Sequence, residues 1–248
     1  QRPLVVCGEP GSGKTALMAQ AAELARQSSD IVLIERYLGT SPASSDLRGL
    51  LHSVCAEIAA ADHDESPIPS DELELVLDFR KRLRSVAGTR RIVVFFDALE
   101  QLSTSSQMAA FEWLPWRLPP HVRVVVSVLQ DEVDSLASRF GVKNDALLRL
   151  GALPEKDARP LLADWLQDAG RQLQTAQCES VLSAFQAANG RPLYLRFAFE
   201  QARTWRSWDP LPGATDGPDP LPGDIPGMIQ SLMSDLESPA RHGPVLAQ

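Results

Sequence analysis

The sequence predicts an α/β domain built on a parallel sheet, followed by a small all-helical lobe. Two observations lead to this prediction. Short, strongly apolar runs alternate with helical patterns as far as residue 150, and no strand signal follows Pro154. Because parallel strands require helical crossovers and bury both faces of their sheet, this alternation indicates a sheet covered by helices on both sides.

Five segments have the character of buried strands, since each is short and rich in Val, Ile, Leu or Phe. They are residues 4–7, 31–38, 91–97, 122–128 and 147–150. Helical patterns fill the intervals between them, at residues 15–26, 47–60, 71–86, 106–113 and 132–140. The lobe is expected to contain helices at residues 155–169, 175–188 and 192–205, with one further amphipathic helix at about 226–236.

Proline and glycine residues divide the C-terminal part of the chain. Nine of them fall between residues 209 and 226, a composition typical of a linker. We therefore expect four parts along the chain. They are a sheet domain over residues 1–152, a helical lobe over residues 153–208, a linker over residues 209–225 and a final segment over residues 226–248.

The composition argues against a membrane span and against a broad nucleic-acid footprint. No apolar run approaches the roughly eighteen residues that suggest a transmembrane helix. A net charge of −8 is opposite in sign to the balance that binding a phosphate backbone requires. Three cysteines and four histidines show no metal-ligand spacing, so we expect reduced thiols in a reducing compartment.

One glycine-rich motif predicts a specific chemistry. The pattern G-x-x-x-x-G-K-[ST] lies directly between the first strand and the first helix, which is the context that a phosphate-binding P-loop requires. Glycines here let backbone N–H groups surround phosphate oxygens, and the helix start adds its positive dipole end. Lys14 is expected to reach the β- and γ-phosphates, and the Thr15 hydroxyl to bind Mg²⁺. The expected nucleotide contacts are Gly8, Glu9, Pro10, Gly11, Ser12, Gly13, Lys14, Thr15 and Ala16.

Two acidic residues follow the third strand. Asp97 ends the apolar run 92–96, so its carboxylate should emerge beside the P-loop and hold Mg²⁺, usually through water. Glu100 lies three residues further on and could polarise a water for attack on the γ-phosphate. The alternative for Glu100 is an ordinary acid near a helix start, where the helix dipole favours negative charge.

Two further residues are candidates for the site. Ser127 ends the fourth strand and could hydrogen-bond the γ-phosphate or the attacking water; an ordinary serine at a strand end is the alternative. Pro192 follows Gly190 between two helical patterns. Glycine can end the first helix and proline suits the first turn of the second, so structure alone explains both residues.

Taken together, these residues resemble the NACHT domains of the STAND class of signalling ATPases. The similarity is strongest to the branch of telomerase-associated and NACHT/WD-repeat proteins with their bacterial relatives, and it covers nearly the whole chain. It rests on residues 2–15, 39–46, 96–102, 113–119, 190–196 and 242–246. The resemblance implies a P-loop NTPase sheet of the ASCE type with order 5-1-4-3-2, and ATP or ADP as the nucleotide. It also implies that Pro192 packs against adenine and that residues 226–248 open a winged-helix lobe.

The chain departs from the NACHT pattern at two places. Val128 and Leu129 follow Ser127, where NACHT domains usually carry an arginine. Ala98 replaces the usual glycine of the acidic box, of whose acidic pair only Glu100 is left. Slow turnover, or an arginine supplied by a neighbouring subunit, is therefore expected instead of brisk hydrolysis.

Three functions are compatible with these features. The first is a switch in which ADP holds a closed monomer, exchange for ATP permits self-association, and slow hydrolysis resets the state. The second is a scaffold that binds nucleotide without turnover. The third is a small-molecule kinase, which would require an arginine-rich lid over the phosphates. For the switch we expect a homo-oligomer on activation, effector and sensor modules in a longer chain, and a cytoplasmic location. Neither membrane nor direct nucleic-acid contact is expected.

Overall fold

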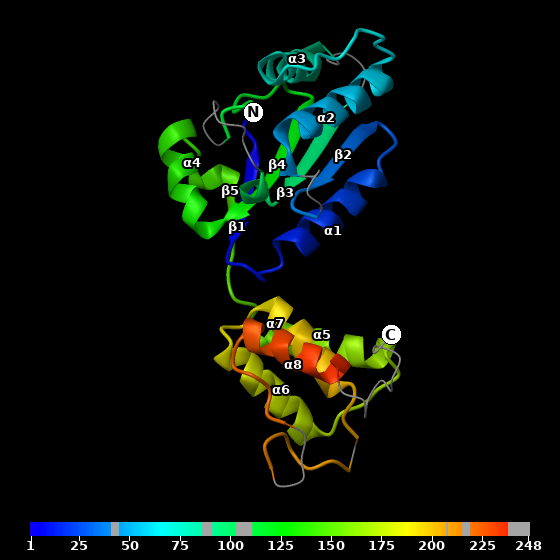
Figure 1. Ribbon diagram of the computed structural model, residues 1–248, viewed down its shortest axis with the longest axis vertical. Helices are drawn as coiled ribbons and strands as arrows, with labels where there is room; N and C mark the ends of the chain where they lie inside the picture. The colour runs from blue at the N-terminus through cyan, green and yellow to red at the C-terminus, as the bar shows by residue number, and fades with distance from the viewer. Residues whose placement is uncertain (41–44, 86–90, 103–110, 207, 215–218, 238–248) are drawn as a thin grey trace. The chain divides into compact units, whose positions relative to one another are not determined.

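The computed structural model describes residues 1–40, 45–85, 91–102, 111–206, 208–214 and 219–237. They form two compact units, one of residues 1–10 and 14–150 and the other of residues 11–13 and 151 onward. Figure 1 traces both. Each unit is described by itself below.

The first unit is a five-stranded, wholly parallel sheet. Its strands are β1 (Leu4–Gly8), β2 (Ile31–Tyr37), β3 (Arg91–Asp97), β4 (Val122–Leu129) and β5 (Leu147–Leu150). They are arranged in the order β2-β3-β4-β1-β5, and every neighbouring pair runs parallel. This confirms the order 5-1-4-3-2 expected from the resemblance. It also brings the carboxyl ends of β1, β3 and β4 to one edge of the sheet.

Helices cover this sheet on both faces (Figure 1). They are α1 (Lys14–Arg26), α2 (Leu47–Asp62), α3 (Glu72–Ser85) and α4 (Val133–Phe140). Alternate strand residues point to opposite faces, so Val6 and Phe95 pack with Met18 of α1. Their neighbours Val5 and Phe96 belong to the larger core with α2, α3 and α4.

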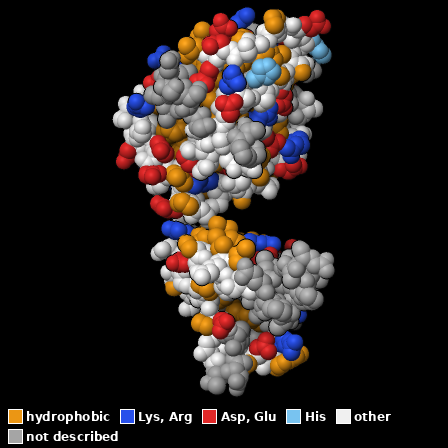
Figure 2. All heavy atoms as spheres, in the orientation of Figure 1, with side chains coloured by type: hydrophobic (Ala, Val, Ile, Leu, Met, Phe, Trp, Pro, Cys, Tyr) orange, Lys and Arg blue, Asp and Glu red, His pale blue; other side chains and the backbone are white. Residues whose placement is uncertain are grey.

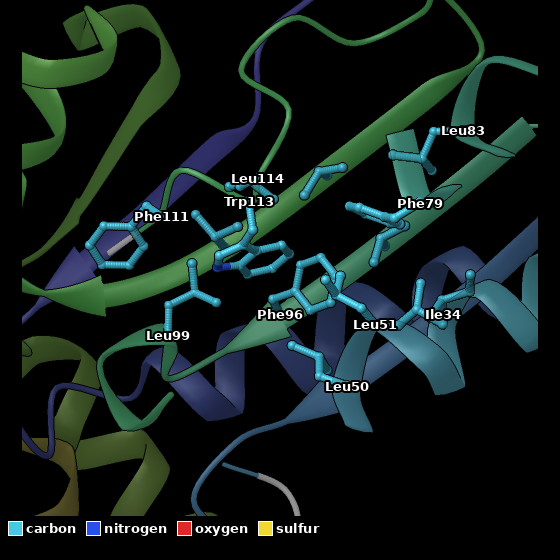
Figure 3. Packing of buried hydrophobic residues seen from close by; sticks show 14 of the residues in the cluster. Ile34, Leu50, Leu51, Phe79, Leu83, Phe96, Leu99, Phe111, Trp113 and Leu114 are labelled. Atoms are coloured by element: carbon cyan, nitrogen blue, oxygen red, sulfur yellow. The ribbon is translucent and has the colours of Figure 1, made fainter. Parts of the chain in front are cut away.

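Aromatic side chains fill the centre of the larger core, as Figure 3 shows. The rings of Phe96 and Trp113 lie edge to face with centroids 5.3 Å apart, and Phe79 of α3 lies 6.5 Å from Phe96. Trp113 is fully buried. Such edge-to-face contacts stabilise a core beyond the area they bury.

The helix expected at residues 106–113 is not found in the part that the structure describes. Residues 103–110 lie outside the described residues, and residues 111–113 form a turn. Phe111 has a φ of 70°, in the left-handed region, which a right-handed helix cannot contain. The turn allows Trp113 to enter the core, so burial decides the local structure here.

The other predicted helices of the first unit are found with their ends shifted by a few residues. Asp46 caps α2 by accepting a hydrogen bond from the Gly49 backbone N–H at 2.8 Å. The same helix ends at His63, which has a φ of 55°. Figure 2 shows acidic and basic side chains interspersed over the displayed face of this unit.

The second unit is helical in its described part. It contains α5 (Glu155–Asp168), α6 (Thr175–Ala187), α7 (Pro192–Ala202) and α8 (Ile225–Glu237). Its core is built on buried residues such as Phe185, Tyr194, Leu195 and Phe199. Met228 of α8 is fully buried in the same core.

Two hydrogen bonds join α7 to the end of the proline- and glycine-rich stretch and to α8. The Tyr194 hydroxyl donates to the Pro222 carbonyl at 2.6 Å, and Gln201 Nε2 donates to Ser231 Oγ at 2.6 Å. The helix α8 therefore packs on the helical lobe. Its assignment to the opening of a winged-helix lobe, like the four-part division of the chain, stays a prediction. No helix in the described part of the chain is both long and apolar enough to cross a membrane.

Candidate nucleotide-binding site

The P-loop connects β1 to α1 and has the backbone form that its glycines permit. Gly11 and Gly13 adopt φ values of 77° and 93°, a region that other residues enter only with strain. Lys14 opens α1 and is only 9% exposed. Its Nζ donates to the carbonyls of Gly8 at 2.8 Å and Glu9 at 3.2 Å. The ammonium group is thus held at the loop, where phosphate oxygens would compete for its donors.

The sheet brings three predicted residues into one hydrogen-bonded group. Asp97, at the end of β3, is 3% exposed and accepts a hydrogen bond from Thr15 Oγ1 at 2.7 Å. Its other carboxylate oxygen accepts from the Ser127 hydroxyl of β4. Because the strands are parallel and adjacent, side chains distant in sequence meet at one edge.

Ser127 is fully buried and uses both of its hydrogen-bonding functions within this group. It donates to Asp97, and its oxygen accepts the Ala98 backbone N–H at 2.7 Å. A serine hydroxyl has a single proton to donate. To donate a hydrogen bond to a phosphate, Ser127 would first have to release Asp97.

Glu100 lies in a short 3-10 turn, η2 (Leu99–Gln101), directly after this group. It is half-buried, and its Oε2 is buried without a hydrogen-bond partner among the described residues. Burial raises the pKa of this carboxyl, and the carboxylates of Asp97 and Glu132 act in the same direction. A hydrogen bond to its own backbone and the charge of Lys14 partly oppose the increase. A raised pKa makes the carboxylate a better proton acceptor.

Ala98 joins Asp97 to the turn that carries Glu100, and its backbone is left-handed. Its φ is 58° and its ψ 53°, which L-residues other than glycine adopt at a cost. This explains why the NACHT pattern has glycine at the position. Sequence reasoning noted the replacement but did not assign Ala98 a role in the site; alanine in place of glycine was the available signal.

The oxygen atoms of Thr15 and Asp97 fit a Mg²⁺ ion that also binds a nucleotide. Magnesium prefers hard oxygen ligands and usually takes only one or two carboxylates from the protein, with phosphate and water supplying the rest. Among the described residues there is no group of three or more His, Cys, Asp or Glu side chains that could enclose a metal. A Mg²⁺ ion shared between these two residues and a nucleotide stays a prediction.

Pro192 lies in the second unit, where it opens α7 as its first residue. Gly190, two residues earlier, has a φ of 60°, and its carbonyl accepts the Leu153 N–H at 2.8 Å. A Cβ at Gly190 would lie 3.0 Å from the Leu153 carbonyl oxygen. The Gly-x-Pro segment therefore has a structural reason of its own, and the contact of Pro192 with adenine stays a prediction.

Comparison with known proteins agrees with this geometry. The family described as AAA ATPase domain matches residues 1–127. The chain is 32% identical over 216 residues to the human NACHT and WD repeat domain-containing protein 2, covering 83% of this chain and 12% of that protein. Human NACHT domain- and WD repeat-containing protein 1 is 32% identical over 224 residues, covering 86% and 14%. Mouse telomerase protein component 1 is 23% identical over 250 residues, covering 96% and 9%.

Two solved structures support the fold alone. The ORC1 protein of Aeropyrum pernix in complex with DNA has a TM-score of 0.55 at 15% identity, covering 94% of this chain and 59% of that one. Cdc6p from Pyrobaculum aerophilum has a TM-score of 0.51 at 15% identity, covering 79% and 52%. With its P-loop, sheet order and relatives, the chain belongs to the AAA/NACHT family of P-loop NTPase domains, and nucleotide binding follows from that membership.

Proposed function

We propose that this domain is a nucleotide-driven switch with slow, Mg²⁺-dependent ATP hydrolysis. In this proposal ADP holds a closed monomer, exchange for ATP permits self-association, and hydrolysis resets the state. The observation that supports turnover most directly is Glu100. A half-buried carboxylate with one oxygen left without a hydrogen-bond partner costs stability, and such groups are typical of functional sites.

Each residue of the site has a distinct part in the proposed reaction. Lys14 and the loop N–H groups bind the phosphates, and Thr15 and Asp97 hold Mg²⁺. When bound, the metal neutralises charge on the phosphates. Glu100 accepts the proton of the attacking water as it adds to the γ-phosphorus, and ADP leaves. Pro192 contacts adenine in this scheme.

A nucleotide-binding scaffold without turnover is the second candidate. The observation that favours it is the end of β4, where Val128 is fully buried and Leu129 follows, so that no arginine comes after Ser127. Retention of Asp97 and Glu100 opposes it. A small-molecule kinase is the weakest candidate, because no arginine-rich lid is evident in the sequence.

We further infer that the domain works within a longer chain. It spans only 12% and 14% of the length of the two human NACHT and WD repeat proteins it matches. Their names combine a NACHT domain with WD repeats, which supports effector or sensor modules beside this domain. A cytoplasmic location and homo-oligomerisation on activation belong to the same proposal.

The test combines nucleotide content, turnover and assembly. We expect ADP in the denatured supernatant of the purified protein by mass spectrometry, and slow single-turnover hydrolysis of ATP that requires Mg²⁺. Size-exclusion chromatography with light scattering should show larger species with ATP than with ADP. Lys14→Ala is the control, because it removes the ammonium group of the phosphate cradle and should abolish all three signals.

Two outcomes would contradict the proposal. Wild-type affinity for Mg-ATP in Lys14→Ala would show that the P-loop is not the binding site. Tight binding of ATP with no turnover by the wild type would favour the scaffold.

A further inference from the structure

The turn between β3 and Glu100 depends on a residue poorly suited to its conformation. Ala98 is left-handed and is the residue at which the chain leaves β3 for the turn that carries Glu100. Alanine strongly prefers other backbone regions. Some contact in the surrounding structure must therefore hold Ala98 in place.

The turn is anchored at three points. The Ala98 N–H donates to Ser127 Oγ at 2.7 Å. The Leu99 side chain is 3% exposed and belongs to the main core. Gln101 lies against Gly39, where a Cβ would come within 2.9 Å of Gln101 Cγ. The Ala98 carbonyl also accepts the Gln101 N–H at 2.9 Å, within the turn itself. Of these contacts, the Ser127 hydrogen bond is the one that ties Ala98 to a neighbouring strand.

The Ser127 hydroxyl is matched to this task. The Ser127 side chain is fully buried, and Asp97 fixes its orientation by accepting a hydrogen bond from the hydroxyl. The hydroxyl oxygen is left to accept the Ala98 N–H. Without it that N–H would have no partner at this position, which is unfavourable for a partly buried donor. The net contribution of such a hydrogen bond and the strain of a left-handed alanine are of similar size.

We propose that Ser127 is a positioning residue: its hydroxyl holds Ala98 in the left-handed conformation and thereby places Glu100. This differs from a direct contact of Ser127 with the γ-phosphate or the attacking water. Its catalytic consequence rests on the proposed hydrolysis, whereas its structural consequence does not. The alanine at position 98 makes the chain dependent on the serine, and a glycine there would remove that dependence.

The test uses Ser127→Ala, Ala98→Gly and the double variant. Ser127→Ala should lower the single-turnover rate about tenfold, the effect of losing one good hydrogen bond, while ATP affinity stays within about twofold. Adding Ala98→Gly should bring the rate back to within about threefold of the Ala98→Gly variant, because glycine adopts the turn without help. His63→Gly is the matched control, since it relaxes a left-handed residue at the end of α2 and should rescue nothing.

Crystal structures of the nucleotide-free variants provide a readout independent of turnover. In Ser127→Ala the φ of Ala98 should leave the left-handed region, and in the double variant the glycine at position 98 should keep it. An unchanged Ala98 in Ser127→Ala, or a rate that stays low in the double variant, would overturn the proposal. If the wild type shows no turnover, the proposed hydrolysis fails and the crystal structures alone decide the role of Ser127.

Discussion

Two junctions of the molecule contain left-handed residues within three positions of the end of a regular element, and the residue types differ between them. After α6, Asn189 and Gly190 adopt φ values of 63° and 60°. Both residue types enter this region readily. After β3, the same region is occupied by Ala98, which does not.

The difference separates a structural turn from a turn that carries a functional group. Gly190 fits its conformation and also leaves room for the Leu153 carbonyl. Ala98 is held by Ser127 and leads to Glu100, whose buried carboxylate is itself unfavourable. Local strain is typical of functional sites, where the surrounding structure over-determines the geometry.

The largest expected effect comes from removing the group that the strained turn positions. Glu100→Gln keeps the size of the side chain but cannot accept the proton of water. Single-turnover hydrolysis should fall by about 10²–10⁴-fold, while ATP affinity is retained, because the carboxylate acts only in the transition state. Rapid-quench hydrolysis beside isothermal titration would measure both. An unchanged rate would show that the β3 junction carries no catalytic base.

Alanine is tolerated at the junction after β3, but we expect it to destabilise the protein at the junction after α6. Gly190→Ala adds left-handed strain and a contact of 3.0 Å with the Leu153 backbone oxygen, so we expect a loss of about 2–3 kcal/mol in the free energy of unfolding. Gly170→Ala is the control, because Gly170 has a φ of 63° with open space around it; its loss should be about 1 kcal/mol. Denaturant titration compares the two. Equal losses would mean that the Leu153 contact contributes nothing.

Replacing the strained alanine after β3 should raise the free energy of unfolding, by less than Gly190→Ala lowers it. Ala98→Gly should stabilise the protein by up to about 1 kcal/mol, because glycine adopts the left-handed conformation at no steric cost. Chemical denaturation would measure the gain. A loss of stability instead would show that Ala98 is not strained, and the contrast with Asn189 and Gly190 would disappear.

The buried carboxylate at this junction should also give stability a distinct pH dependence. The pKa of Glu100 is raised in the folded state above its ordinary value of 4.5, so its charged form lowers stability at pH above the folded pKa. As the pH falls through that pKa towards 4.5, the cost disappears. Glu100→Gln should therefore be more stable than the wild type at neutral pH and lose this advantage in acid. Paired unfolding curves at several pH values provide the measurement, and a constant difference would contradict it.

Much of the fold could be predicted because it depends on local pattern. Apolar strand patterns and helical patterns are readily told apart along the sheet domain. The residues at the carboxyl ends of adjacent parallel strands must meet, which brings Asp97 to Ser127. The fate of residues 111–113 could not be predicted, because helical spacing competes there with the burial of Trp113 against Phe96. In the structure the long-range packing of Trp113 prevails, and residues 111–113 form a turn.

The hydrogen bonds of the site could not be predicted from the sequence either. Ser127 was expected to face a phosphate or water, yet its one donor is directed at Asp97 and its oxygen at Ala98. That arrangement depends on a side-chain rotamer and on the backbone angle at position 98. Neither is specified by residue spacing. The P-loop motif and the strand ends predict which residues belong to the site, and the folded structure shows which of them are hydrogen-bonded to one another.

The burial of Met228 has a consequence for how the chain matures during synthesis. Translation releases α5, α6 and α7 first, and the helix that completes their core follows only after the proline- and glycine-rich stretch. Until then the part of the core that Met228 fills, and the side of α7 that contacts α8, are uncovered. The lobe therefore completes its core only once the ribosome has delivered α8, and apolar surface exposed before that point is the kind that chaperones bind.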